Sequence, residues 1–168
     1  MTQRNRIRVL FVCLGNICRS PTAHGVFRDR VAAAGLVDRI EVDSAGTGDW
    51  HVGKPPDARA RAAAAARGCD IGDLRARQVA AADLRAFDYV LAMDADNLAV
   101  LERLARESAD ARARVALFGD YSGRHPRAAV PDPYFGGEDG FERVLDLIED
   151  AAEGLLVEIR ADLERDPG

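Results

Sequence analysis

The feature that most constrains the fold is a short apolar segment that leads directly into a turn and then a helix start. Residues 7–12 (IRVLFV) predict a buried β-strand, and Cys13 follows at its carboxyl end. After a turn-like stretch, Ser20 and Pro21 predict a helix start, because serine is a favoured N-cap and proline a favoured first helical residue. This order of elements predicts a βα unit of a parallel sheet.

Strand and helix signals alternate along the rest of the chain. Further strands are predicted over residues 40–44, 87–93 and 115–118, and helices over 20–34, 55–67, around Leu98–Leu104 and over 141–163. Gly154 is expected to cost the last helix about 1 kcal/mol. We therefore predict an α/β fold with three layers, in which a central four-stranded parallel sheet carries helices on both faces. Residues 1–168 are expected to form a single domain.

The composition disfavours several classes of function. Apolar stretches stay well short of the roughly 18 residues that span a bilayer, so no membrane association is expected. The net charge of −5 argues against a nucleic-acid partner. Three irregularly spaced cysteines imply no disulfide framework, and no signal peptide is expected, which together favour a cytoplasmic location. Export without a signal stays open.

Residues 13–20 (CLGNICRS) have the composition of an anion-binding loop. A loop that wraps round to a helix N-terminus can point several backbone N–H groups at one anion. Gly15 and Asn16 accept the left-handed backbone angles that such a curl requires, and the planar fork of Arg19 matches two phosphate oxygens. We therefore expect phosphate or sulfate to bind in this loop, against Leu14, Gly15, Asn16, Ile17, Cys18, Arg19 and Ser20.

The positive electrostatic potential of this anion-binding loop also acts on Cys13. Amide donors, the helix dipole and Arg19 favour its thiolate form, and the Ser20 hydroxyl is placed to stabilise it. A thiolate at the floor of an anion nest predicts phosphoryl transfer through a phosphocysteine. No metal and no organic cofactor is needed, because the loop and Arg19 already supply the charge stabilisation.

The leaving group of such a reaction needs an acid, since a tyrosine phenol has a pKa of about 10. Asp132, in the segment VPDPYF at residues 130–135, is the candidate, because two prolines fix the backbone around it. The alternative is that Asp132 is a turn residue, as aspartate before proline often is.

Taken together, these segments resemble the low-molecular-weight protein tyrosine phosphatase family. The resemblance covers nearly the whole chain and rests on the loop at 13–20 after an N-terminal strand and on Asp132-Pro133-Tyr134. Further matches are residues 43–47, 76–78 and 87–88, Trp50, Met93-Asp94 and Asn97. It implies a phosphotyrosine-containing protein as substrate and the fold of that family.

The resemblance also implies a role for individual residues. Cys13 would be the nucleophile, Arg19 the phosphate clamp, and Asp132 the acid of the first step and the base of the second. The other implied roles are loop support by Asn16, Ser20 and Ser44, a substrate cleft walled by Trp50, Tyr134 and Phe135, and oxidative pairing of Cys13 with Cys18.

The chain departs from the family pattern at two positions. The family often carries a histidine where this chain has Leu74, and that histidine helps to hold the loop. The second aromatic residue after the Asp-Pro pair is Phe135 rather than tyrosine. Ile17 favours a tyrosine substrate, because relatives that act on phosphoarginine tend to carry threonine there.

Other interpretations remain open at this point. Cys13 is an inert core residue in one, and a metal ligand together with Cys18 in another. An arsenate reductase and a binding module that holds phosphotyrosine without cleaving it are the rival functions. His24, His51 and His125 are expected to be solvated, the arginine-rich helix over residues 59–67 to present a solvated face, and Cys69 to be structural. The protein is expected to be a monomer or a weak dimer.

Overall fold

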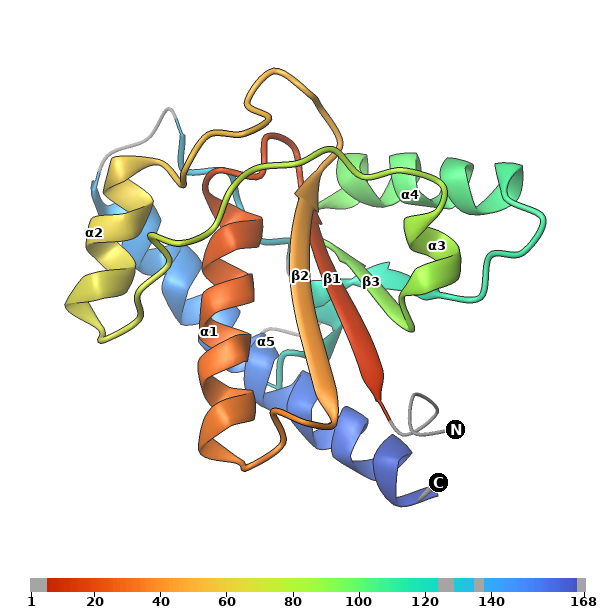
Figure 1. Ribbon diagram of the computed structural model, residues 1–168. Helices are drawn as coiled ribbons and strands as arrows, with labels where there is room; N and C mark the ends of the chain where they lie inside the picture. Colours follow the sequence, from red (N-terminus) through yellow and green to blue (C-terminus); the bar gives the residue numbers. More distant parts are fainter. Residues whose placement is uncertain (1–5, 124–128, 135–137, 166–168) are drawn as a thin grey trace.

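The computed structural model describes residues 6–123, 129–134 and 138–165. The elements are β1 (Ile7–Cys13), α1 (Arg19–Ala33), β2 (Ile40–Gly46), α2 (Ala58–Ala66), α3 (Asp83–Ala86), β3 (Tyr89–Ala92), α4 (Ala95–Glu107), β4 (Arg114–Leu117), the 3-10 helix η2 (Phe118–Tyr121) and α5 (Glu138–Arg165) (Figure 1). No helix in these ranges is both long and apolar enough to cross a membrane.

The four strands form one parallel sheet in the order β2-β1-β3-β4, which confirms the predicted sheet. Cys13 of β1 lies opposite Gly46 of β2, and Val12 lies opposite Ala92 of β3. The chain leaves β1 toward β2 on one side and later returns to β3 on the other. The crevice outside the carboxyl ends of β1 and β3 is therefore the switch point where ligands bind in open α/β sheets.

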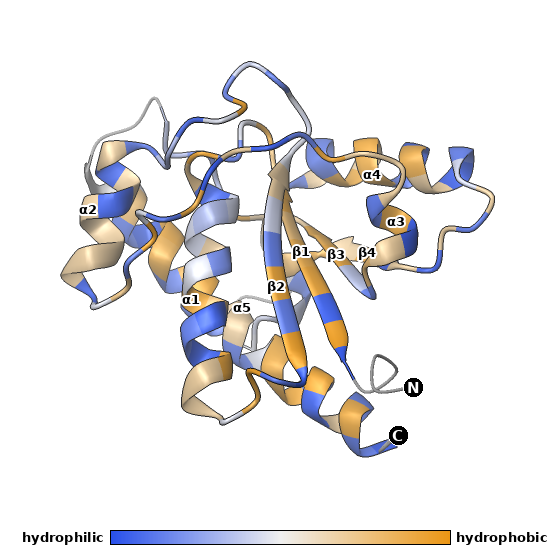
Figure 2. Ribbon diagram, viewed as in Figure 1, coloured by the Kyte–Doolittle hydropathy of each residue, from blue (hydrophilic) through white to orange (hydrophobic). Residues whose placement is uncertain are grey.

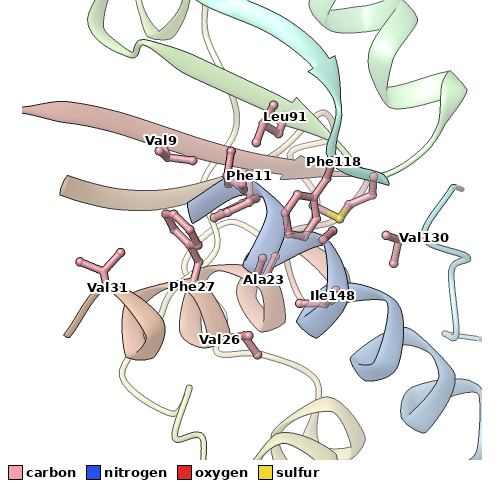
Figure 3. Packing of buried hydrophobic residues seen from close by; sticks show 14 of the residues in the cluster. Val9, Phe11, Ala23, Val26, Phe27, Val31, Leu91, Phe118, Val130 and Ile148 are labelled. Atoms are coloured by element: carbon pink, nitrogen blue, oxygen red, sulfur yellow. The ribbon is translucent and has the colours of Figure 1, made fainter. Parts of the chain in front are cut away.

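Helices cover both faces of the sheet, as predicted (Figure 1). The side chains of β1 point alternately to the two faces and therefore enter two separate hydrophobic cores. Val9, Phe11 and Cys13 belong to the cluster built with α1 and α5, whereas Leu10 and Val12 belong to the cluster with α3 and α4. Phe11 is the centre of the first cluster, with edge-on ring contacts to Phe27 at 5.8 Å and Phe118 at 4.9 Å between centroids (Figure 3).

The long C-terminal helix is confirmed, and hydrophobic and hydrophilic residues alternate around both α4 and α5 (Figure 2). Gly154 was expected to be a tolerated weak point of the last helix, but the structure gives this glycine a packing role. A Cβ at this position would lie 1.8 Å from the carbonyl oxygen of Tyr121 in η2. Glycine is therefore required here for the close approach of α5 to η2.

Several boundaries differ from the prediction. The first helix begins at Arg19, and Ser20 is not its N-cap, because the serine hydroxyl turns toward Cys13. The second begins at Ala58 after Asp57, whose side chain caps it. The four-residue helix α3 was not predicted, since it is too short to carry a hydrophobic period.

Candidate active site

The loop that follows β1 is anchored from outside through its carbonyl groups. The carbonyl oxygens of Cys13 and Leu14 accept hydrogen bonds from the amides of Thr47 and Gly48, both at 2.9 Å. The Ile17 carbonyl accepts from the Asp57 amide at 2.8 Å. Because these three carbonyls are held outside the curl, the segment keeps a fixed shape at the carboxyl end of β1.

Two positions in and beside this loop explain its tight curvature. Asn16 has a φ of 57°, the left-handed conformation predicted for it. Gly46 lies so close beneath the loop that a Cβ would be 2.8 Å from the Leu14 carbonyl oxygen. The expectation for Gly15 was wrong, since its φ is not positive; it instead lies against His51, whose Cδ2 would be 2.9 Å from a Cβ.

Cys13 lies at the floor of the loop with 2% of its surface exposed. Its sulfur is 3.1 Å from the hydroxyl oxygen of Ser20 and accepts a hydrogen bond from the Asn16 amide at 3.3 Å. Polar groups therefore face this sulfur, unlike the surroundings of an inert core cysteine.

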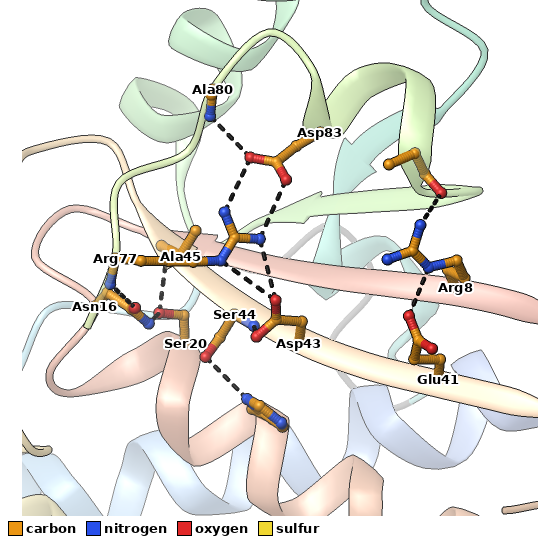
Figure 4. Close-up of polar contacts among 12 residues, drawn as sticks. Arg8, Asn16, Ser20, Glu41, Asp43, Ser44, Ala45, Arg77, Ala80 and Asp83 are labelled. Carbon is orange, nitrogen blue, oxygen red and sulfur yellow. Dashed lines mark hydrogen bonds and ion pairs between the residues drawn. The ribbon is translucent and has the colours of Figure 1, made fainter. Parts of the chain in front are cut away.

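The Asn16 side chain fixes both the loop and Ser20. Its Nδ2 donates to the Ser20 hydroxyl at 2.7 Å, and its Oδ1 accepts from the Arg77 amide at 3.0 Å. The Arg77 guanidinium pairs in turn with Asp43 of β2 and Asp83 of α3 (Figure 4). These contacts hold the segment that carries the Arg77 amide against the sheet, so Asn16 has a fixed partner.

The Ser44 side chain, which the resemblance assigns to loop support, contacts the helix that follows the loop. Its hydroxyl is 2.9 Å from Nδ1 of His24, a side chain of α1 that is only 7% exposed (Figure 4). The expectation that His24 is solvated is therefore wrong, and burial lowers its pKa from 6.5 to about 4. The neutral imidazole joins α1 to β2 behind the loop. Leu74, where the family often has histidine, is buried.

Arg19 is buried at the first position of α1, with 2% exposure. Its Nη1 donates to Asp94 Oδ2 at 2.6 Å and to the Val130 carbonyl at 3.1 Å, and its Nη2 lies 3.6 Å from Asp132 Oδ2. The contact with Asp94 was not predicted. Its position directly after a strand of the parallel sheet was the available signal.

The segment around Asp132 reaches the loop because Val130 is attached to the end of β3. The Val130 amide donates to the Met93 carbonyl at 2.8 Å, and the Val130 side chain is 1% exposed. Two residues later, the Asp132 side chain is 40% exposed, and its Oδ1 accepts from the Tyr134 amide at 3.0 Å. The carboxylate thus opens on the same crevice as Cys13.

A cavity of about 190 Å³ lies over the loop. It brings together nine of the residues chosen from the sequence, namely Cys13, Leu14, Gly15, Ile17, Cys18, Arg19, Trp50, Asp132 and Tyr134. His51 also lines it, which the sequence reasoning missed by treating this histidine as solvated. Phe135 and His125 lie outside the described residues.

All three cysteines are free thiols. Cys18 packs with Ala60 and Phe141, and its burial raises its pKa to about 12. Burial also raises the pKa of Cys69 to about 12, beside α1. Within the described ranges, no cluster of three or more histidine, cysteine and acidic side chains is arranged to hold a metal ion.

Known proteins share this sequence and arrangement. The family model described as low molecular weight phosphotyrosine protein phosphatase matches residues 8–166. A relative from Streptomyces coelicolor, named low molecular weight protein-tyrosine-phosphatase, is 48% identical over 162 residues, which cover 94% of this chain and 96% of the relative.

Solved structures agree. A protein tyrosine phosphatase from Entamoeba histolytica, with Hepes in its active site, superimposes with a TM-score of 0.86 at 38% identity, covering 93% of this chain and 98% of the other. An arginine phosphatase from Drosophila gives a TM-score of 0.85 at 35% identity and covers 91% and 98%.

The matches confirm the resemblance read from the sequence and the predicted enzyme class, a cysteine-dependent protein-tyrosine phosphatase. The fold agrees as well, since the four-stranded parallel sheet and its two helical layers superimpose on the solved phosphatases. This chain belongs to the low molecular weight phosphotyrosine protein phosphatase family.

Proposed function

We propose that the protein removes phosphate from tyrosine side chains of proteins in two steps. The Cys13 sulfur bonds to phosphorus as the bond from phosphorus to the tyrosine oxygen breaks, and Asp132 gives that oxygen its proton. Water then attacks the phosphocysteine, Asp132 takes a proton from the water, and the sulfur–phosphorus bond breaks. Inorganic phosphate leaves and Cys13 is restored as a thiolate.

One observation carries the proposal: the nucleophile, the clamp and the acid open on one cavity. Cys13, Arg19 and Asp132 come from β1, α1 and a loop more than a hundred residues further along the chain, and all three line it. The amides of residues 14–20 and the Arg19 fork would hold the phosphate oxygens, with Asn16 and Ser20 supporting the loop and Ser44 bracing it from β2. The reaction needs no metal or organic cofactor.

The proposed substrate is phosphotyrosine rather than phosphoarginine. Trp50 and Tyr134 line the cavity and would enclose a phenyl ring, and Phe135 is assigned to the same cleft on the resemblance alone. Ile17 in the cavity wall favours an aromatic ring over a charged guanidine. The protein is proposed to act as a single domain, a monomer or weak dimer, in the cytoplasm and without nucleic acid.

The chemistry is tested with para-nitrophenyl phosphate in the presence of EDTA. The wild type is expected to hydrolyse it, and Cys13→Ser is expected to lose hydrolysis while still binding phosphate or sulfate. Full activity of Cys13→Ser would remove the proposal, and activity confined to phosphoarginine would assign a different substrate.

Cys13 and Cys18 are also proposed to form a reversible disulfide that shields the nucleophile from over-oxidation. After peroxide treatment, activity of the wild type should return with a thiol reductant, whereas Cys18→Ser should stay inactive. Equal recovery of both proteins would refute the pairing.

A further inference from the structure

Arg59, near the start of α2, reaches across to the loop that carries the acid. Its Nη2 donates a hydrogen bond to the Tyr134 carbonyl oxygen at 2.8 Å. Its guanidinium carbon also lies over the rings of Tyr134 and Phe141, 5.4 Å and 5.0 Å from their centroids. The side chain therefore holds the backbone of the acid loop and the aromatic residue beside it.

Asp57 ties the other end of this contact to the phosphate loop. Its two carboxylate oxygens accept from Nε and Nη2 of Arg59 at 3.1 and 3.2 Å. The Asp57 amide donates to the Ile17 carbonyl at 2.8 Å, within the loop that begins at Cys13. This pair, which we term the Asp57–Arg59 link, thus connects the segment of the nucleophile with the segment of the acid.

Tyr134 connects Arg59 to Asp132 through hydrogen bonds of its backbone. Its carbonyl accepts from Arg59, and its amide donates to Asp132 Oδ1 at 3.0 Å. Both backbone polar groups of a single residue are used, one for the link and one for the carboxylate. Only two hydrogen bonds and one residue separate the Arg59 guanidinium from Asp132.

We infer that Arg59 is a positioning residue, which acts through Tyr134 to set where the Asp132 carboxyl stands relative to Cys13. The inference rests on the proposed function, in which Asp132 protonates the leaving group. Such proton transfer is sensitive to placement, because a displacement of about 1 Å of a catalytic group can cost on the order of 100-fold in rate. The Arg59 side chain is 45% exposed, so we expect its substitution to leave the fold intact.

The test compares Arg59→Gln with a matched control, Arg61→Gln. Arg61 lies on the same helix, and its guanidinium sits beside Gly72, on a segment that is not part of the link. The measured quantity is kcat/KM for a phosphotyrosine peptide and for para-nitrophenyl phosphate, whose leaving group is a far weaker base.

Arg59→Gln is expected to lower kcat/KM about tenfold for the peptide and less than about twofold for para-nitrophenyl phosphate, since only the first needs a well-placed proton. Arg61→Gln is expected to change neither value. Equal losses on both substrates, or no loss on either, would overturn the inference. If Arg59→Gln does not fold, Arg59→Lys enters the same comparison.

Asp132→Asn separates this inference from the proposed function. It should lose activity preferentially on the peptide, and Arg59→Gln should add nothing further in the Asp132→Asn background, because the two residues act as one unit. Selective loss in Asp132→Asn without selective loss in Arg59→Gln refutes the role of Arg59 alone. No selectivity in Asp132→Asn refutes the acid role itself.

Discussion

Nη1 of Arg19 donates a 2.6 Å hydrogen bond to Oδ2 of Asp94, and this pair joins the first helix to the end of β3 beneath the cavity. The arginine is buried, so its orientation depends on that carboxylate and on the Val130 carbonyl. A guanidinium without Asp94 would turn toward the second carboxylate nearby, that of Asp132.

Asp94→Asn is therefore expected to lower kcat/KM by about tenfold, because the clamp loses its orientation while the asparagine still caps α4. The control is Asp96→Asn in the first turn of the same helix, which removes the same charge from an exposed position. Steady-state kinetics and the inhibition constant of phosphate provide the measurement. A gain in phosphate affinity would show that removal of negative charge outweighs the loss of orientation.

A second prediction concerns Asn16, whose left-handed backbone and side-chain bonds have separable effects. Asn16→Ala and Asn16→Gly both remove the hydrogen bonds to Ser20 and Arg77 and should both lose most activity. Glycine accepts the φ of 57°, so the glycine variant should be more stable than the alanine variant by about 1 kcal/mol. Urea unfolding of the two variants checks this order, and an alanine variant that is the more stable would contradict it.

His24 predicts a pH dependence of stability. Its pKa is lowered to about 4 in the folded protein, chiefly by burial, against 6.5 for a free histidine. The unfolded chain therefore takes up the proton first as the pH falls. The stability contributed by neutral His24 is fully present above pH 6.5, falls between 6.5 and 4, and is gone below 4.

Between pH 7 and pH 5 this amounts to about 2 kcal/mol of unfolding free energy. Urea titrations of the wild type and of His24→Gln at both values isolate the effect, since the other ionisable groups are common to both. The difference between the two proteins should shrink by this amount at pH 5. Parallel pH profiles would mean that the pKa of His24 is the same in the folded and the unfolded protein.

At Gly154 we expect substitution by alanine to change the stability in the direction opposite to that given by helix propensity. Alanine in a helix is normally favoured over glycine by about 1 kcal/mol, and Gly140→Ala in the same helix should follow that rule, since its Cβ meets only an ordinary contact. Gly154→Ala should instead destabilise the protein by about 1–3 kcal/mol or more, because the methyl group overlaps the Tyr121 carbonyl. Thermal unfolding of both variants gives the comparison, and a stabilised Gly154→Ala would refute the close contact.

The sequence was informative where structure is local. The strand, the curl and the helix around Cys13 are encoded within about fifteen consecutive residues, so periodicity and turn residues sufficed. The attachment of Asp132 was not accessible in this way, because it depends on the hydrogen bond from Val130 to Met93, which joins residues far apart in the chain. The family resemblance supplied that step.

Other contacts escaped for the same reason. His24 looked solvated because nothing in a helix sequence states which face will meet Ser44 of a distant strand. Arg77 appeared only as part of a matching motif, whereas its role depends on the carboxylates of two separate elements, Asp43 and Asp83. Ser20 was read both as a helix cap and as a hydroxyl placed on Cys13. The hydroxyl lies against Cys13 and Asn16, so the cap was wrong and the placement beside Cys13 agrees with the expectation.

The depth of Cys13 has a further consequence. With 2% of its surface exposed, Cys13 lies below Trp50 and Tyr134 in the cavity, so we expect a phosphorus on a long side chain to reach its sulfur best. The phosphorus of a phosphoserine stands only a few bonds from its own backbone, so we expect phosphoserine to reach the Cys13 sulfur less well than phosphotyrosine. The burial of the nucleophile therefore favours phosphorylated residues with long side chains at the binding step, before the first bond to phosphorus forms.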